Sequence, residues 1–385
     1  MIDRKGQDIN VLFDWDAVVR NPHSGFYTFG TNLISGLTAL EENLSLTLFF
    51  QARYQGISKR FLTGLTECQR NRIRTRKCPF KFRWIERLWQ LFPYLSLEAL
   101  AGNYELYHCF HHFMPPRFSG QRILTVHDLR RYRLPHLYRR SNLLPFELAV
   151  RRADHFICVS NATKRDLCSI FNVNPRAVDV VHLGCKEKLT RMKQSIRGED
   201  EDPLKTRGIK CKRFLLAFSS KDRRKNVISI ARAFDLVRES LPQGTALVII
   251  GKLRRDEKAK LESFSMVYQV GEVDNVYPWL SQSYGLVFAS LYEGFGLPIL
   301  EAFSTRTPVI TSNCSSMPEV AGDAAILVNP KDIREMAEAI KRLCLDEEIR
   351  KELIRQGSKR LKQFSWEKSA KKTLEVYRRL LKSKS

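Results

Sequence analysis

LYEGFGLPILEAF, residues 291–303, is the stretch that decides the fold. Gly294 and Gly296 permit backbone angles that are closed to other residues, so the run between them is not ordinary helix. Pro298 suits the first turn of a helix, which predicts that a helix begins directly after this glycine-rich loop. Such a junction presents backbone N–H groups and the positive end of the helix dipole. The stretch therefore predicts an anion-binding site at a strand–loop–helix junction.

Two glutamates, Glu293 and Glu301, stand eight residues apart in the same stretch. Glu301 falls early in the predicted helix, from where its carboxylate can reach the two hydroxyls of a ribose. A capped turn with a solvated glutamate would produce the same short pattern. The decision between the two interpretations rests on the surrounding sequence.

Short apolar runs alternate with helical patterns such as 228–238 and 333–343 along the chain. This alternation favours doubly wound α/β sheets, whose ligands bind outside the carboxyl ends of the strands. The predicted strands are residues 11–13, 46–50, 123–126, 156–159 and 178–182, followed by 214–218, 246–250, 286–289, 308–311 and 325–328.

The chain has 385 residues, which is enough for two domains of roughly 100–200 residues each. Residues 187–212 are charged and poor in apolar groups, which predicts a connection between a first domain at 1–186 and a second at 213–364. Residues 365–385 predict a closing helix that begins at Trp366, with Ser365 as its N-cap and basic residues toward its C-terminus.

The formal net charge of +24 predicts an anionic partner, which can be a nucleic acid, an anionic membrane or a phosphorylated substrate. The start, MIDRKGQDIN, lacks the apolar core of a signal peptide, and no window approaches 18 consecutive apolar residues. We therefore expect a cytoplasmic protein, with peripheral attachment to the inner face of the cytoplasmic membrane as an option. The nine cysteines form no CxxC pair, which favours reduced thiols over a zinc or redox site.

Residues 289–340, ASLYEGFGLPILEAFSTRTPVITSNCSSMPEVAGDAAILVNPKDIREMAEAI, closely resemble the signature of the family-4 glycosyltransferases. Similar matches are RRADHFICVSNATKRDLCSIFNVNPRAVDVVHLG at 151–184, TVHDL at 125–129 and FSSKDRRKN at 218–226. The resemblance implies the GT-B fold: two Rossmann-like, doubly wound parallel-sheet domains that face each other across a cleft. It also implies that the closing helix crosses back to the first domain.

The resemblance implies that the second domain binds a nucleotide-sugar donor. Arg224 and Lys225 match the cations that hold the donor diphosphate, whose charge grows as the sugar leaves. Glu293 matches the residue beside the transferred sugar, and Glu301 the residue on the nucleotide ribose. Backbone amides toward phosphate or sugar are expected from Gly294, Phe295, Gly296 and Leu297.

In the first domain, the resemblance places His127 near the C6 hydroxyl of the sugar and Asp128 beside it, where it orients the loop. Gly25 matches the glycine that approaches the donor phosphate, although Tyr27 and Thr28 stand where the family pattern has a glycine and an arginine.

The implied reaction retains the configuration at the anomeric carbon and needs neither a cofactor nor a metal. The acceptor attacks from the face that the diphosphate leaves, and the departing phosphate can take the acceptor proton. Asp14 and Asp16 are spaced as DxD, and we interpret them as a structural pair.

The first domain is expected to bind the acceptor. Arg130 and Arg131 follow the His–Asp loop and either hold a pyrophosphate-linked lipid or form a solvated face. His111 and His112 belong to residues 107–116, for which we expect a loop at the cleft mouth rather than a metal site.

Residues 81–95, KFRWIERLWQLFPYL, repeat apolar residues at helical spacing and carry basic residues beside them. Two interpretations stay open. The segment is either an interfacial helix that rests on anionic lipid or a helix that packs its apolar residues on the core.

The favoured function is sugar transfer in surface polysaccharide or glycolipid assembly, onto a glycan or lipid-linked acceptor. Similarity to mannosyltransferase-like members makes GDP-mannose the first choice of donor, with a UDP-sugar as the alternative. A catalytically silent glycan-binding subunit is a further alternative. Nucleic-acid binding is disfavoured, because the sequence has no RRM, KH, zinc-finger or helix-turn-helix pattern.

Overall fold

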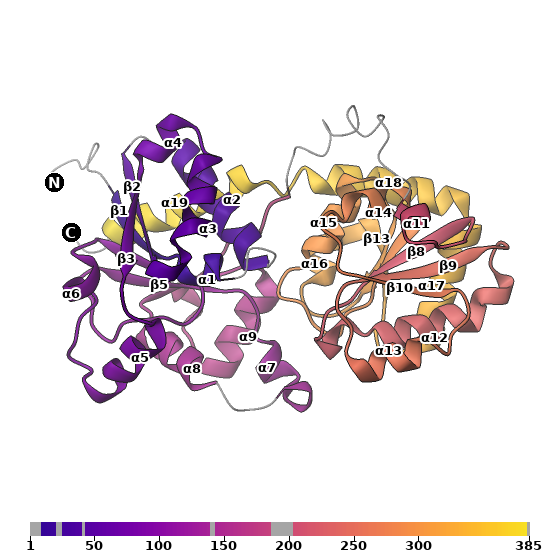
Figure 1. Cartoon of the computed structure of the whole chain (residues 1–385), viewed down its shortest axis with the longest axis horizontal. Coiled ribbons are helices and arrows are strands. Elements are labelled where there is room, and N and C mark those ends of the chain that lie inside the picture. Colours follow the sequence, from indigo (N-terminus) through magenta and orange to yellow (C-terminus); the bar gives the residue numbers. More distant parts are fainter. Residues whose placement is uncertain (1–8, 21–24, 41–42, 139–142, 186–202, 383–385) are drawn as a thin grey trace. The chain divides into compact units, whose positions relative to one another are not determined.

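The computed structural model describes residues 9–20, 25–40, 43–138, 143–185 and 203–382 (Figure 1). The chain divides into two compact units, Met1–Gly184 with Trp366–Ser385, and Cys185–Ser365. Most of the expected linker, residues 187–202, lies outside the described residues, and its remainder includes a short helix, α11 (Pro203–Thr206).

The first unit is built on a seven-stranded parallel sheet with the order β3-β2-β1-β4-β5-β6-β7. The strands are β1 (Ile9–Asp14), β2 (Leu44–Gln51), β3 (Ile73–Cys78), β4 (Leu106–Cys109), β5 (Gln121–Val126), β6 (His155–Cys158) and β7 (Val178–Val180). Helices cover both faces of this sheet, with α2 and α19 on one face and α5, α8 and α9 on the other (Figure 1).

The α-helices of the first unit are α1 (Asp16–Val19), α2 (Gly25–Leu40), α3 (Gln55–Thr63), α4 (Glu67–Asn71), α5 (Phe82–Leu91), α6 (Glu98–Ala101), α7 (Arg130–Arg133), α8 (Leu144–Arg152), α9 (Asn161–Phe171) and α19 (Trp366–Lys382). Its 3-10 helices are η1 (Ala52–Tyr54), η2 (Pro135–Leu137) and η3 (Pro175–Ala177).

The second unit has a six-stranded parallel sheet with the order β10-β9-β8-β11-β12-β13. Its strands are β8 (Arg213–Phe218), β9 (Thr245–Ile250), β10 (Val267–Gly271), β11 (Gly285–Phe288), β12 (Val309–Ser312) and β13 (Ala325–Val328). Its remaining α-helices are α12 (Val227–Val237), α13 (Arg255–Leu261), α14 (Tyr277–Gln282), α15 (Leu297–Ser304), α16 (Met317–Ala321), α17 (Ile333–Leu345) and α18 (Glu347–Leu361), and its 3-10 helices are η4 (Arg223–Lys225), η5 (Arg238–Ser240) and η6 (Gly322–Ala324). Figure 1 shows α12, α13 and α17 on one face of this sheet and α14, α15 and α18 on the other.

The predicted fold class, two doubly wound parallel sheets, is confirmed. Central strands such as β9 are buried along their whole length because helices cover both faces, and this is why they consist of unbroken apolar runs. Three strands escaped the sequence analysis. β3 and β10 are edge strands, and β3 exposes a row of basic side chains, as edge strands often do.

The third missed strand, β4, corrects an expectation. Residues 107–116 were expected to form a loop, but Tyr107, His108 and Cys109 belong to a buried strand in the middle of the sheet. Only the residues that follow Cys109 form the expected loop.

The last helix of the chain, α19, packs in the first unit against α2. The two helices approach so closely that a Cβ on Gly36 would lie 2.9 Å from Cβ of Ala370. Tyr377 of α19 is fully buried, and its hydroxyl contacts Nδ1 of His108 on β4. Among the described helices, none is long and apolar enough to cross a bilayer.

Candidate active site

The loop after β8 carries two of the predicted donor-binding residues and is fixed at both ends. Asp222 accepts a hydrogen bond from the backbone N–H of Arg224 (3.2 Å) and another from its Nε (3.0 Å). Asn226 takes a left-handed backbone conformation with φ of 59°. Its Nδ2 donates to the carbonyl oxygens of Ala289 (3.1 Å) and Pro330 (2.7 Å). The loop is therefore tied to the residues that follow β11 and β13.

Arg224, Lys225 and Glu293 form a buried charge cluster at the carboxyl ends of β8 and β11. Nζ of Lys225 lies 2.8 Å from Oε1 of Glu293, and Arg224 pairs with the other carboxylate oxygen. Arg224 also donates to the carbonyl oxygen of Tyr292 (2.8 Å), and the Lys225 ammonium lies 4.7 Å from the ring centre of Phe288. The three charged side chains are only 11%, 14% and 9% exposed, respectively.

The electrostatics keep Glu293 ionised. Burial alone would raise the pKa of this carboxyl, but attraction to Lys225 and Arg224 outweighs burial and lowers the pKa to about 2. Burial lowers the pKa of Lys225, and the charge of Glu293 opposes that effect. A carboxyl group with such a low pKa is a poor proton acceptor near neutral pH. It is suited to holding cations and hydroxyl groups in place.

The glycine-rich loop after β11 leads into α15 as the sequence predicts. Gly296 has a φ of 104° and is the N-cap of the helix, a conformation that strains any residue with a side chain. Oγ of Ser316 donates to the carbonyl oxygens of Glu293 (2.9 Å) and Phe295 (2.8 Å). In a trans peptide, the C=O of one residue and the N–H of the following residue point in opposite directions. The carbonyl groups of Glu293 and Phe295 point toward Ser316, so the N–H groups of Gly294 and Gly296 point away from it.

Glu301 lies on α15, partly buried, beside Tyr277 of α14. Burial raises the pKa of the Tyr277 phenol, and the charge of Glu301 raises it further. Sequence analysis did not single out Tyr277 or Ser316. A polar residue that follows the motif, as Ser316 does, is a weak signal on its own.

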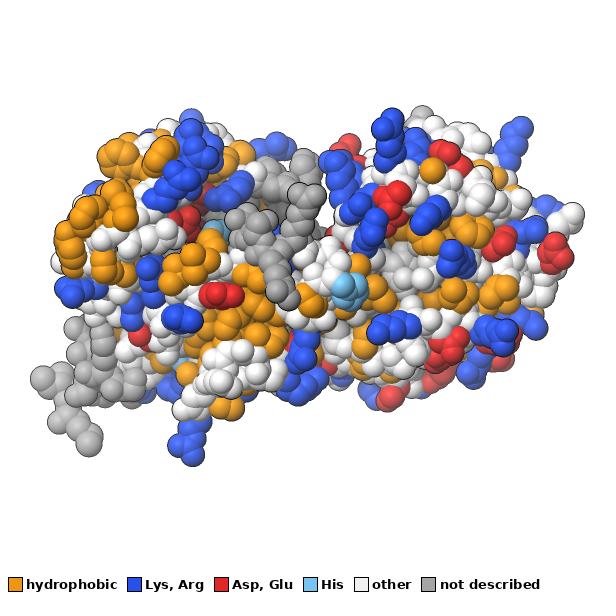
Figure 2. All heavy atoms as spheres, turned by 90° about the horizontal axis from the view of Figure 1, so that it is seen from below, with side chains coloured by type: hydrophobic (Ala, Val, Ile, Leu, Met, Phe, Trp, Pro, Cys, Tyr) orange, Lys and Arg blue, Asp and Glu red, His pale blue; other side chains and the backbone are white. Residues whose placement is uncertain are grey.

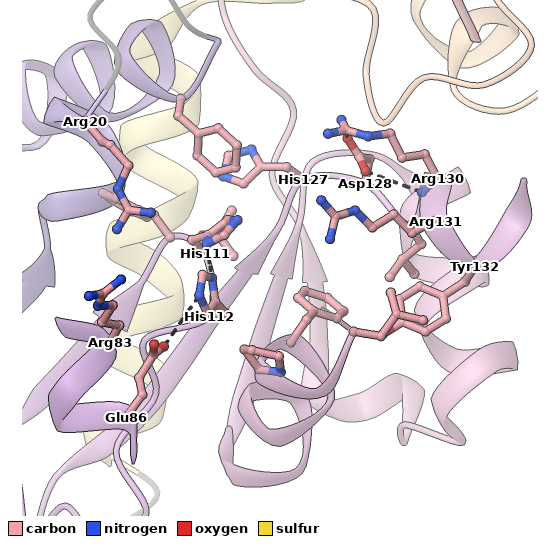
Figure 3. Close-up of a pocket in the computed structure, with 17 residues that line it drawn as sticks. Arg20, Arg83, Glu86, His111, His112, His127, Asp128, Arg130, Arg131 and Tyr132 are labelled. Carbon is pink, nitrogen blue, oxygen red and sulfur yellow. Dashed lines mark hydrogen bonds and ion pairs between the residues drawn. The ribbon is translucent and has the colours of Figure 1, made fainter. Parts of the chain in front are cut away.

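The first unit contains a pocket of about 630 Å³ into which six of the predicted residues converge (Figure 3). They are His111, His112, His127, Asp128, Arg130 and Arg131. The pocket forms where β4 and β5 end, which is the edge of the sheet where ligands of this architecture bind.

His127 follows β5 and is held between two phenylalanine rings. The ring centres of Phe26 and Phe29 lie 4.5 Å and 4.7 Å from that of the imidazole. Burial lowers the pKa of His127 to about 4, so the ring is neutral near pH 7. Its Nε2 atom is buried and has no hydrogen-bond partner among the described residues. A neutral imidazole with an unsatisfied nitrogen is suited to binding a substrate hydroxyl.

Asp128 is engaged with its neighbour. Nη1 of Arg130 lies 2.6 Å from Oδ2 of Asp128, and the backbone N–H of Arg130 approaches the other oxygen at 3.4 Å. Arg131 instead extends from α7 into the pocket, toward the side that carries His111 and His112 (Figure 3). The two adjacent arginines therefore have different surroundings.

The wall opposite Arg131 contains a histidine pair and one carboxyl group. The Nδ1 atoms of His111 and His112 contact each other, and Nε2 of His112 lies 3.5 Å from Oε1 of Glu86. Burial, followed by the charges of Arg20 and Arg131, lowers the pKa of His112 to about 4. Burial raises the pKa of Glu86 to about 7, so this carboxyl is partly protonated at neutral pH.

Four arginines, Arg20, Arg83, Arg130 and Arg131, line the pocket, together with two acidic residues, Asp128 and the partly ionised Glu86. Arg130 is paired with Asp128, and Arg20 is paired with Asp16 outside the pocket lining. The pocket has a net positive charge. Sequence analysis missed Arg20, which directly follows α1, and Arg83 on α5. Both are distant from the histidines in sequence and come close to them only in the folded sheet.

The remaining predicted residues lie near these sites. Gly25 is the exposed first residue of α2, and a Cβ placed on it would meet no atom within 4 Å. Residues 21–24, which precede it, are outside the described residues. Asp16 accepts hydrogen bonds from Gln51 and pairs with Arg20 at 2.7 Å, so it joins α1 to the end of β2. Within the described parts of the chain, no group of three or more His, Cys, Asp or Glu side chains could hold a metal ion.

Two family models match the chain in succession. Residues 43–187 match Glycosyltransferase Family 4, and residues 212–346 match Glycosyl transferases group 1. The first match contains His127 and the second contains Lys225 and Glu293, so each site has residues in a matched segment. The chain belongs to glycosyltransferase family 4. The cluster of Arg224, Lys225 and Glu293 and the pocket beside His127 are accordingly the candidate active-site parts of a glycosyltransferase.

Curated relatives of this glycosyltransferase include two enzymes of O-antigen synthesis. The O-antigen chain mannosyltransferase B of Escherichia coli is 24% identical over 287 residues, which cover 71% of this chain and 74% of the relative. The O-antigen chain mannosyltransferase RfbU of Salmonella typhimurium is 25% identical over 272 residues, or 66% of this chain and 70% of the relative.

A solved structure supports the fold of the family-4 glycosyltransferase over nearly its full length. The sucrose-phosphate synthase of Thermosynechococcus elongatus superposes with a TM-score of 0.71 at 18% identity, covering 97% of this chain and 100% of the other. At this identity the likeness establishes the architecture and leaves the substrate to be argued from the site.

Proposed function

We propose that this glycosyltransferase moves mannose from GDP-mannose, with retention and without a metal, onto a glycan or lipid-linked acceptor in surface polysaccharide or glycolipid assembly. The buried cluster of Arg224, Lys225 and Glu293 is the observation that carries the proposal. The choice of mannose is supported by the two O-antigen mannosyltransferases among the relatives. The proposed place of action is the cytoplasmic face of the membrane.

The donor diphosphate would bind at Arg224 and Lys225. A guanidinium has five donor hydrogens and an ammonium has three, so each cation can hold Glu293 and a phosphate oxygen at the same time. The amides of Gly294 and Gly296, at the start of α15, would add hydrogen bonds to phosphate or sugar. Glu301, further along the same helix, would accept from the ribose hydroxyls.

In the transfer step, the bond between the anomeric carbon and the diphosphate oxygen breaks. The acceptor oxygen forms its bond to the same carbon on the same face, and the acceptor proton passes to the departing phosphate. Arg224 and Lys225 would stabilise the charge that gathers on the leaving group, the role that a metal ion has in other transferases. Glu293 would position the cations and the sugar, because its low pKa makes it a poor base.

The positively charged pocket beside His127 would receive the acceptor. Arg20, Arg83 and Arg131 would favour an acceptor that carries phosphate, such as a pyrophosphate-linked lipid, because arginine forms paired hydrogen bonds with phosphate oxygens. Arg131 is the better candidate of the two predicted arginines, since Arg130 is paired with Asp128. His127 would bind a hydroxyl of the transferred sugar.

Thermal-shift measurements with GDP, UDP, ADP, dTDP and their common sugars test the donor class, each with and without EDTA. A ligand at 100 times its Kd adds about 2.7 kcal/mol of stability, which raises the melting temperature clearly. Stabilisation by GDP and GDP-mannose that EDTA does not change supports the proposal. Selective stabilisation by UDP would mean that the donor is a UDP-sugar and not GDP-mannose. No response to any nucleotide would favour a silent glycan-binding subunit.

Retention needs a second measurement. Transfer of mannose to an acceptor, followed by NMR of the new glycosidic linkage, should show the α configuration of the donor. A β linkage would exclude the proposed mechanism while leaving the donor assignment intact.

A further inference from the structure

Exposed apolar side chains are concentrated in one short segment of the first unit. Seven of the eleven large hydrophobic residues that are exposed in the described chain fall between residues 80 and 95. Their exposure runs from 38% to 72%, and they are Phe80, Trp84, Leu88, Leu91, Phe92, Tyr94 and Leu95. Figure 2 shows apolar side chains gathered on the left part of the view, where Figure 1 has the first unit, with Lys and Arg around them.

The helix α5 within this segment is apolar on two sides. Phe82, Ile85 and Trp89 are buried and pack on the core, where Phe82 stacks on Phe113 with ring centres 3.9 Å apart. At about 100° per residue, Trp84 and Leu91 fall on the opposite side of the helix. Core packing and an exposed apolar face were alternatives in the sequence analysis, and the helix has both.

Phe92 differs from the buried apolar residues of α5. It continues the helical spacing of the buried residues, but α5 ends at Leu91 and the Phe92 side chain is 41% exposed. Phe92 therefore adds to the exposed apolar face and not to the core.

Basic residues border the exposed face. The guanidinium carbons of Arg83 and Arg87 lie 5.5 Å and 5.1 Å from the ring centre of Trp84. Residues 72–95 contain seven lysines and arginines and a single acidic residue, Glu86, which lines the pocket described above. An apolar face with a basic border is complementary to a lipid bilayer, whose interior is apolar and whose headgroups can be anionic.

We propose that residues 80–95, here called the α5 surface, dock on an anionic lipid bilayer. Trp84, Leu88 and Leu91 would enter the boundary between headgroups and acyl chains, where amphipathic aromatic rings are favoured. Arg87 and Lys81 would meet the anionic headgroups, to which basic residues near the surface are attracted.

A second copy of this chain fits the α5 surface poorly. Self-association through residues 72–95 would bring together two segments of net charge +6, from seven basic residues and one acidic residue each, and like charges oppose such contact. An anionic bilayer satisfies both the apolar face and the charge.

Docking would also place the acceptor. Arg83 and Glu86 line the positively charged pocket from the same helix that carries Trp84 and Leu88, so the bilayer would lie next to the pocket. An acceptor anchored in the bilayer by a lipid could then present its phosphorylated end to Arg20, Arg83 and Arg131. This consequence rests on the proposed function, whereas docking itself does not.

The test is co-sedimentation of the full chain with vesicles of phosphatidylcholine, with and without phosphatidylglycerol. The variant Trp84→Ser/Leu88→Ser/Leu91→Ser should bind the anionic vesicles at least about tenfold more weakly, since it removes three exposed apolar side chains. The control is Leu236→Ser/Leu345→Ser, which changes leucines that are 64% and 53% exposed in the second unit and should bind as the unchanged chain does.

Two results would overturn the proposal. One is equal binding of both variants to the anionic vesicles. The other is a dimer, seen by sedimentation velocity without lipid, that the triple variant abolishes while vesicle binding stays. GDP-induced thermal stabilisation of the unchanged chain and of both variants is measured in parallel. If GDP stabilises none of the three proteins, the donor assignment is wrong, whereas the docking proposal is unaffected.

Discussion

Nζ of Lys225 lies 2.8 Å from Oε1 of Glu293, and this contact joins the loop after β8 to the loop after β11. The two strands are neighbours in a parallel sheet, so their carboxyl ends lie at the same edge although the residues are 68 positions apart. The order of the strands thus positions Lys225, which would bind the donor, next to Glu293, which holds Lys225 in place.

Substitution of the two buried cations should impair transfer far more than substitution of their exposed neighbour. Lys225→Ala and Arg224→Ala should each lower kcat/KM by about 10²–10³-fold, because each removes a donor aimed at developing charge. Arg223 pairs with Asp256, and both side chains are more than 40% exposed. Arg223→Ala should therefore change kcat/KM by less than about fivefold, the effect of losing a surface ion pair.

Steady-state transfer to a fixed acceptor measures all three variants, with the melting temperature as the check on folding. If Arg223→Ala were as harmful as Lys225→Ala, a diffuse basic field would explain donor binding better than the buried cluster.

Glu293→Gln should destabilise the second unit in a pH-dependent way. The folded pKa of Glu293 is about 2, below the usual 4.5, so its ionised form contributes stability above pH 4.5 that is lost as the pH falls toward 2. At neutral pH the loss of this charge should cost about 3–5 kcal/mol, because it leaves Arg224 and Lys225 buried without their counter-charge. Urea unfolding of both proteins at several pH values should show this difference shrinking between about pH 5 and pH 2. A difference that is constant with pH would mean that the amide disturbs packing and not charge.

His127 should stay neutral across the physiological range. Its folded pKa of about 4 lies below the usual 6.5, so the folded state loses stability as the pH falls below 6.5, where the unfolded chain binds the proton. The imidazole proton resonance of His127, assigned by its absence in His127→Gln, should not titrate between pH 8 and pH 5.5. Titration near pH 6.5 would show that the ring is hydrated, which contradicts its place between Phe26 and Phe29.

Tyr377→Phe should cost about 1–3 kcal/mol, since it leaves a buried imidazole nitrogen without a partner. Nδ1 of His108 lies 2.5 Å from the Tyr377 hydroxyl, and Nε2 lies 2.6 Å from Oγ1 of Thr125. The matched control is Tyr268→Phe in the second unit, where the hydroxyl is near the surface and makes a longer contact with the carbonyl oxygen of Lys210 (3.4 Å). Guanidinium unfolding curves of the two variants separate these outcomes, and equal small losses would mean that water replaces the phenol at His108.

Sequence alone predicted most of the strands that are buried on both faces, and β4 is the exception. β9 is an unbroken apolar run because helices cover it on both sides, and such runs are visible without a structure. β3 has one neighbouring strand and reads IRTRKC, so its charges concealed it. β4 escaped because His108 is accommodated in the core by Tyr377, a partner 269 positions away that no local pattern reveals.

The candidate donor site was predictable because its residues lie in local motifs. The pocket of the first unit was predictable only in part. His127 and Arg131 belong to one continuous stretch, whereas Arg20 follows α1 and Arg83 lies on α5. Their approach depends on the strand order β2-β1-β4-β5, which brings together the ends of strands that are distant in sequence.

The packing of α19 against α2 has a consequence for how the protein is made. During synthesis, residues 1–184 emerge from the ribosome long before Trp366–Lys382 are made. The first unit therefore lacks its last helix while the whole second unit is synthesised. Until α19 is made, Gly36 and His108 lack their contacts with Ala370 and Tyr377 and stay exposed to solvent. A fragment that stops at residue 184 should therefore be prone to aggregate, and adding residues 366–382 as a separate peptide should rescue its solubility.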